Sequence, residues 1–140
     1  MLRRYLGFIV AANLLWEFVQ MPLYSIWQTG TPLQIVFAAV HCTGGDVLIA
    51  LSAIASALLL TGDATWPSAG YVRVAAVAVL MGLAYTVFSE WWNVEVRKAW
   101  SYSDLMPIVP GLDIGLSPLL QWIIIPIAAF RWATSGERSK

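Results

Sequence analysis

The chain has 140 residues, of which 59% are hydrophobic and 11% are charged, and its formal net charge at pH 7 is zero. Soluble domains contain about 25% charged residues, so this composition excludes an ordinary soluble domain and indicates an integral membrane protein. The lack of net positive charge argues against a nucleic-acid partner. A single cysteine, Cys42, excludes an intramolecular disulfide and a cysteine-only metal cluster.

The first predicted element is a membrane-spanning helix over residues 5–26. Arg3 and Arg4 precede this apolar run, as basic residues do in a secretory signal. The run continues through Asn13 and Glu17 without a small-residue cleavage site, and it is longer than the apolar region of a typical signal. We therefore interpret it as a retained transmembrane helix.

Three further apolar runs, over residues 34–60, 72–92 and 116–132, are each close to the ~20 residues that a bilayer requires. The predicted fold is therefore all-α, an integral membrane bundle of four transmembrane helices. We assign this domain to residues 1–133 and predict a disordered cytoplasmic tail over residues 134–140.

The starts of the second and fourth spans carry helix-start signals. Thr31 can cap the second span, Pro32 suits its first position, and Gln34 can return a hydrogen bond to the cap. Ser117 is predicted to cap the fourth span in the same way. Pro126 lies inside that span and is predicted to kink it.

The placement of Lys and Arg predicts the orientation of the bundle. With both termini inside, only Arg97 and Lys98 fall on the outer side. We therefore expect a multi-pass protein of the bacterial inner membrane with cytoplasmic amino and carboxyl termini. The long outer loop between the third and fourth spans is predicted to fold back over the bundle or to lie in the interface.

Polar residues of all four spans are predicted to converge at one depth. Because successive helices run in opposite directions, the acids and their polar neighbours fall together in the outer half of the membrane, whereas the inner half has almost nothing polar. Helical spacing places several of them on shared faces. These residues are Asn13, Glu17 and Gln20 in the first span, His41 and Asp46 in the second, Thr86, Glu90 and Asn93 in the third, and Gln121 in the fourth.

This convergence of acids suggests acid–base chemistry. An ionised carboxylate in the bilayer costs about 2.5–3.5 kcal/mol on insertion scales, so we expect at least one acid to keep its proton. A protonated acid beside an ionised one can donate and remove protons. The predicted catalytic residues are Glu17, Asp46, Glu90 and His41. The predicted substrate-binding residues are Asn13, Trp16, Gln20, Thr86, Trp92, Asn93 and Gln121.

No metal or cofactor is predicted, because His41 and Cys42 fall short of a closed ligand set and no nucleotide-binding loop or zinc-protease motif is present. A structural interpretation competes with the catalytic one. Glu17 and Glu90 could hydrogen-bond across helices, and the tryptophans could be interface anchors. The Gly44–Gly45 pair is predicted to be a close helix-packing contact or the site of a bend.

The segments NLLWEFVQMPLY, HCTGGD, FSEWWN and SPLLQW resemble a family of small four-helix bacterial inner-membrane proteins over nearly the whole chain, a family that brings no activity with it. More distantly, the site is similar to those of EXPERA-type isomerases, including the sterol isomerases, and of the integral-membrane terpene cyclases. That resemblance implies roles in a membrane cavity for His41, Glu17, Glu90, Asn93 and Trp92. The order and spacing of the acids differ from both groups.

Three functions follow as hypotheses. The first is a membrane enzyme that isomerises or cyclises a lipid or isoprenoid in a polar cavity in the outer half of the bilayer. The alternative is a non-catalytic accessory subunit or small-ligand-binding protein, in which the acids fix helix partners. The third is a component of a proton or cation pathway. The expected partners are a membrane lipid or isoprenoid and either further copies of the chain or a larger membrane complex.

Overall fold

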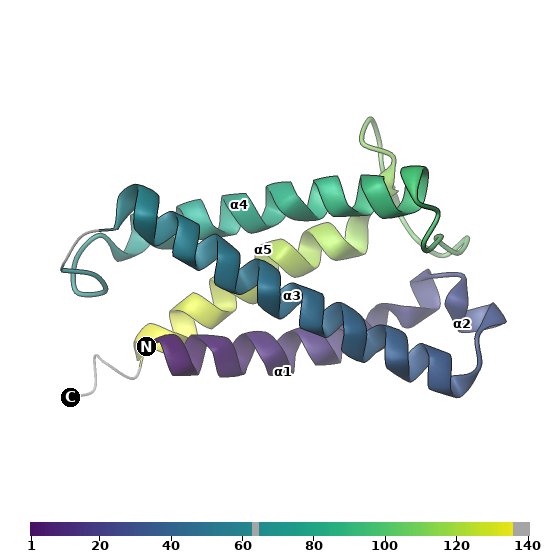
Figure 1. The fold of residues 1–140 in the computed structure, drawn as a ribbon, viewed down its shortest axis with the longest axis horizontal. Helices are drawn as coiled ribbons and strands as arrows, with labels where there is room; N and C mark the ends of the chain where they lie inside the picture. The colour runs from purple at the N-terminus through teal and green to yellow at the C-terminus, as the bar shows by residue number, and fades with distance from the viewer. Residues whose placement is uncertain (63–64, 136–140) are drawn as a thin grey trace.

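The structure is a computed structural model that describes residues 1–62 and 65–135. Four long helices pack together as a bundle, with short irregular segments at the two ends (Figure 1). The elements in chain order are α1 (Leu2–Gln20), the 3₁₀ turn η1 (Met21–Leu23), α2 (Ile26–Thr29), α3 (Pro32–Thr61), α4 (Tyr71–Trp91), the π-helical turn η2 (Trp92–Val96), β1 (Ile108–Val109), β2 (Ile114–Gly115) and α5 (Leu116–Ser135).

The described chain contains four helical segments that are long and apolar enough to cross a membrane. Successive long helices run in opposite directions, so the start of α1 and the end of α5 lie at the same end of the bundle (Figure 1). At that end the guanidinium carbon of Arg4 lies 4.5 Å from the centroid of the Trp132 ring. These findings confirm the four predicted spans and define a multi-pass membrane protein.

Local sequence signals explain where the first span ends and where the second span begins. Pro22 lies in the 3₁₀ turn that follows Gln20, and α1 stops six residues before the predicted end of its span. The predicted capping box of α3 is confirmed. The Thr31 backbone N–H donates to Gln34 Oε1 at 2.8 Å, and the Gln34 N–H donates to Thr31 Oγ1 at 3.3 Å.

The fourth span begins at the predicted residue, but its predicted cap and its predicted end differ from the structure. Helix α5 begins at Leu116, so Ser117 lies inside its first turn and its hydroxyl bonds to a neighbouring helix instead of capping α5. The helix continues past Pro126 to Ser135, and it therefore includes the first two residues of the predicted tail. The rest of that predicted tail, residues 136–140, lies outside the described residues.

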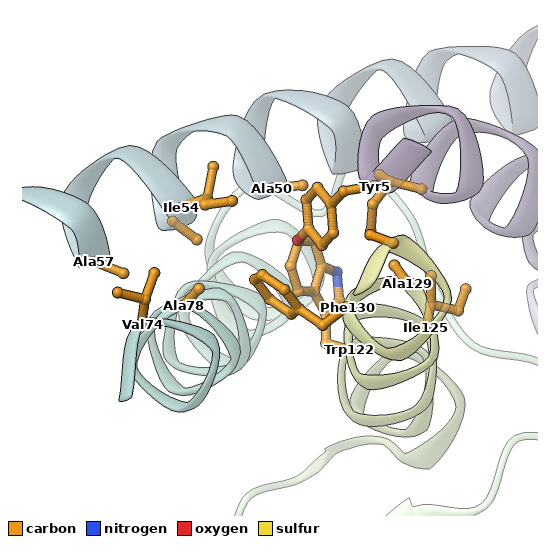
Figure 2. Close-up of a cluster of buried hydrophobic side chains, with 13 residues drawn as sticks. Tyr5, Ala50, Ile54, Ala57, Val74, Ala78, Trp122, Ile125, Ala129 and Phe130 are labelled. Atoms are coloured by element: carbon orange, nitrogen blue, oxygen red, sulfur yellow. The ribbon is translucent and has the colours of Figure 1, made fainter. Parts of the chain in front are cut away.

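The apolar core occupies the half of the bundle that contains the start of α1 (Figure 2). Alanines on α3, α4 and α5 let the helices approach closely, and larger side chains fill the space between them. Tyr5 and Phe130 are both buried, with ring centroids 4.5 Å apart. Trp122 joins this core from the middle of the bundle and links it to the polar half.

The closest glycine-mediated packing involves Gly82 and not the predicted Gly44–Gly45 pair. A Cβ atom on Gly82 would lie 2.4 Å from the indole ring of Trp122, so only glycine leaves room for this ring on α4. No atom lies within 4 Å of a Cβ atom built on Gly44 or on Gly45. The prediction of a tight contact at that pair is therefore wrong, and α3 runs through it as regular helix.

The loop between α4 and α5 folds back over the end of the bundle, as predicted. We call residues 97–115 the strap. Its backbone pairs with the segment that follows α1 through a bridge between Tyr24 and Tyr102. The Ser103 N–H donates to the Leu23 carbonyl at 2.9 Å, and the Ser25 N–H donates to the Ser101 carbonyl at 3.0 Å. The strap thus closes one end of the bundle between α1 and α4.

Candidate functional site

Glu17 on α1 and Asp46 on α3 meet around the side chain of Gln121 on α5. The Gln121 Nε2 atom lies 3.0 Å from Glu17 Oε1 and 3.0 Å from Asp46 Oδ2. The two carboxyl groups therefore lie next to each other across one nitrogen atom. All three side chains are more than 90% buried. Side chains from three membrane-spanning helices therefore converge on one point inside the bundle.

Other buried polar groups surround this pair. Gln121 Nε2 also lies 2.8 Å from Asn13 Oδ1, and Gln20 Nε2 donates to Glu17 Oε1 at 2.9 Å. The indole N–H of Trp122 donates to Asp46 Oδ1 at 3.3 Å. Every donor in this set is an uncharged amide or indole. The ion pair recorded in the described chain, Lys98 with Glu95, is exposed on the surface.

A chain of hydrogen bonds leads from this cluster to the outer face of α1. The hydroxyl of Ser117 donates to Gln20 Oε1 at 2.7 Å and accepts from the indole N–H of Trp16 at 3.2 Å. Trp16 is half-buried and lines an apolar groove of about 260 Å³ between α1 and α5. The predicted site residues Asn13, Trp16, Gln20, Asp46, Glu17 and Gln121 thus belong to one connected network.

Glu90 lies in a separate cluster at the end of α4. Its Oε2 atom accepts a hydrogen bond of 2.5 Å from the hydroxyl of Tyr102 on the strap. Tyr24 packs against Tyr102, with ring centroids 5.6 Å apart. The hydrogen bonds recorded in the described chain give the Glu90 cluster no donor in common with the Glu17–Asp46 cluster.

Burial, followed by the neighbouring Glu90 carboxyl group, raises the pKa of Tyr102 above its ordinary value of 10.0. The phenol consequently stays protonated at neutral pH and can donate its hydrogen to Glu90. From the sequence alone, Tyr102 is expected to lie in a solvated turn. Its hydrogen bond to Glu90 forms only because the strap folds back onto the bundle.

The remaining predicted site residues lie apart from both clusters. His41 is exposed on α3 and stacks against Phe37 with a centroid distance of 5.6 Å. Thr86 is buried, but its hydroxyl donates to the Gly82 carbonyl of its own helix at 3.0 Å. Asn93 likewise bonds to its own helix, at the Ser89 carbonyl. Trp92, 40% exposed, belongs to an aromatic patch on the surface of α4.

A second groove, of about 350 Å³, runs between α3 and α4 and contains Gly45, Ser52 and Tyr85 among its lining residues. Neither this groove nor the one beside Trp16 is lined by Glu17, Asp46 or Glu90. The acids are instead enclosed by the side chains that bond to them. Within residues 1–62 and 65–135, no group of three or more His, Cys, Asp or Glu side chains is arranged to hold a metal ion.

Sequence spacing did not identify Trp122 or Tyr102 as partners of the acids, nor Ser117 as the link between Gln20 and Trp16. Trp122 follows Gln121 directly, and the small residue opposite it, Gly82, is the only sequence signal for its position. Comparisons with protein-family models, curated proteins and solved structures found no match. The fold and the site thus define a class, a multi-pass helical membrane protein with a buried carboxyl pair, and any function must be argued from this geometry.

Proposed function

We propose that the protein is a membrane-embedded acid–base enzyme that isomerises or cyclises a lipid or isoprenoid, with Glu17 and Asp46 as its proton-carrying groups. One observation carries this proposal. Two carboxyl groups from different membrane-spanning helices each lie 3.0 Å from one amide nitrogen, and the donors that surround them are uncharged. Ionisable groups at such positions are usually functional, because they are costly to insert.

Counting hydrogen atoms supports a shared proton. The amide nitrogen of Gln121 carries two hydrogens but has three acceptors in range, on Asn13, Glu17 and Asp46. A contact between two carboxyl groups is a hydrogen bond only if one of them holds a proton, and two bare carboxylates in contact would repel. We therefore assign one proton to the Glu17–Asp46 pair.

This assignment gives a balanced reaction. The protonated carboxyl group donates its proton to one carbon of a substrate double bond, forming a C–H bond and leaving a carbocation on the other carbon. Loss of a proton from a neighbouring carbon, before or after ring closure, forms a new double bond and returns a proton to the carboxylate. Product and substrate have the same atoms, and no oxidant or reductant is consumed.

The apolar groove between α1 and α5 supports a substrate with a long hydrocarbon chain. Phe8, Leu15, Val19 and Ile124 are among its apolar lining residues, and Trp16 forms part of its wall. The hydrogen bonds from Trp16 through Ser117 and Gln20 connect that wall to Glu17. A chain held in the groove would lie beside the acid network, on the side that faces the lipid.

We also propose that both termini face the cytoplasm of a bacterium and that the protein resides in the inner membrane. The amino-terminal end of α1 and the carboxyl-terminal end of α5 lie together and carry Arg3, Arg4 and Arg131. Basic residues flanking transmembrane helices favour the cytoplasmic side. The acid network and the strap would then lie toward the opposite, outer surface.

Lipid analysis of expressing cells tests the enzyme proposal. Wild-type protein should produce a lipid that has the mass of an existing lipid but a different chromatographic retention time. Glu17→Gln and Asp46→Asn should each abolish it, whereas Glu95→Gln, which changes an exposed glutamate, should not. Equal product from the wild type and both site variants would overturn the proposal, provided that the variants reach the membrane in equal amounts.

A second candidate function is that of a non-catalytic membrane subunit. It is favoured because the buried polar groups of the network already bond to one another across the helices. Gln121 ties α1, α3 and α5 together, as a structural polar contact between membrane helices does. Purification in a gentle detergent would then recover a stoichiometric partner protein. That partner should remain bound to the Glu17→Gln and Asp46→Asn variants if the acids only hold the bundle together.

A further inference from the structure

The strap covers the end of the bundle where the acids lie, and two kinds of contact hold it there. On the α1 side the contacts are mainly backbone hydrogen bonds, together with bonds from the hydroxyls of Ser25 and Ser103. On the α4 side the contacts are the bond from Tyr102 to the buried carboxyl group of Glu90 and the packing of β2, with its buried Ile114, against α4. The strap thus joins α1 to α4 across the outer end.

Several features make the Tyr102–Glu90 bond the critical contact. Tyr102 is half-buried, whereas Ser101, Asp104 and Leu105 around it are exposed. The bond is buried at its Glu90 end, and the ring of Tyr102 also packs on that of Tyr24. Displacing Tyr102 would therefore uncover the region between the two acid clusters.

We propose that Tyr102 is a positioning residue that latches the strap, and that its release from Glu90 opens the outer end of the bundle to the polar part of a lipid substrate. That the ligand is a lipid substrate rests on the proposed function. That the outer end of the bundle opens does not. The acids are enclosed in the structure, so a substrate needs a path to them. The strap covers the end of the bundle nearest to the acids, and the Tyr102–Glu90 bond is its side-chain hydrogen bond to α4.

Cys42 provides a reporter for opening, because it is the only cysteine in the chain, is half-buried and lies on α3 four residues before Asp46. The experiment measures the rate at which a membrane-impermeant maleimide labels Cys42 in the full chain, reconstituted in vesicles with the strap side outward. Tyr102→Phe keeps the ring but removes the hydroxyl. It should label up to about tenfold faster than wild type, as expected for losing one hydrogen bond.

A covalent lock provides the matched control. The hydroxyl oxygens of Ser25 and Ser101 lie 2.5 Å apart, so cysteines at both positions should form a disulfide that holds the strap closed. In the Tyr102→Phe background this lock should restore slow labelling of Cys42, and removing the lock with a reducing agent that is washed out before labelling should release it, with the label on Cys42 itself measured by peptide mass spectrometry. A variant that is simply misfolded would label fast whether locked or not.

Glu90→Gln, which weakens the same bond from the other partner, should also label faster than wild type. Equal labelling of wild type, Tyr102→Phe and Glu90→Gln would overturn the latch, as would fast labelling that the lock does not suppress. Neither result depends on lipid turnover. A working latch without any lipid product would leave the strap movement established and would count against the enzyme proposal alone.

Discussion

Glu17 and Asp46 lie on different helices, yet their carboxyl oxygens are each 3.0 Å from the same nitrogen atom of Gln121. This arrangement makes one amide the junction of three membrane-spanning helices. It also places two acids so close together that one proton between them changes an unfavourable contact into a hydrogen bond. Stability and proton chemistry therefore depend on the same few atoms.

Replacing Gln121 with Leu should destabilise the protein by about 2 kcal/mol, because it removes the two hydrogen bonds that the amide nitrogen can donate and the one that the amide oxygen accepts from Gln20, and such bonds average about 0.6 kcal/mol each in a membrane protein. Gln28→Leu changes an exposed glutamine outside the network and serves as the control. Unfolding in a detergent titration gives the free-energy difference. Equal stability of the two variants would show that the network contributes little.

Gly82→Ala should destabilise the bundle by about 1–3 kcal/mol, since the new methyl group would overlap the Trp122 ring. The ring cannot shift freely because its N–H bonds to Asp46. Gly45→Ala adds the same atom to a helix where nothing lies within 4 Å, and it should be neutral or stabilising. Thermal unfolding in detergent distinguishes the two, and a Gly82→Ala protein as stable as Gly45→Ala would contradict the packing described.

The raised pKa of Tyr102 predicts a stability loss at high pH. The unfolded chain ionises this phenol near pH 10, whereas the folded protein holds its proton to higher pH. The contribution is complete below pH 10 and is lost as pH rises through the folded pKa. Tyr102→Phe should therefore lose less stability above about pH 10 than the wild type. Tyr85→Phe, at an exposed tyrosine, is the control and should follow the wild-type curve.

The fold was largely predictable from sequence because hydropathy, helix caps and span lengths are local properties. The capping box at Thr31 and Gln34 is confirmed, with both of its hydrogen bonds present. The end of α1 was misplaced because the apolar run continues beyond Pro22, where the helix geometry changes. Ser117 was assigned to a cap because its partner on α1, Gln20, is far away in the chain.

The candidate site was predictable only in part, since depth in the membrane follows from helix direction but side-chain orientation does not. Glu17, Asp46 and Gln121 meet as their shared depth suggested. His41 lies at a similar level, yet it is five residues before Asp46 on a regular helix and therefore points away, toward Phe37. Glu90 has its own partner because the strap, which has no periodic pattern, brings Tyr102 to it.

The central claim is that Glu17 and Asp46 hold a proton inside the membrane at neutral pH. Infrared difference spectroscopy tests it directly, because a protonated carboxyl group has a carbonyl stretching band that an ionised one lacks. We expect a band that is present in the wild type and in Glu95→Gln and is lost when Glu17→Gln and Asp46→Asn are combined. A wild-type spectrum with no band sensitive to that double substitution would show that both acids are ionised and would contradict the account.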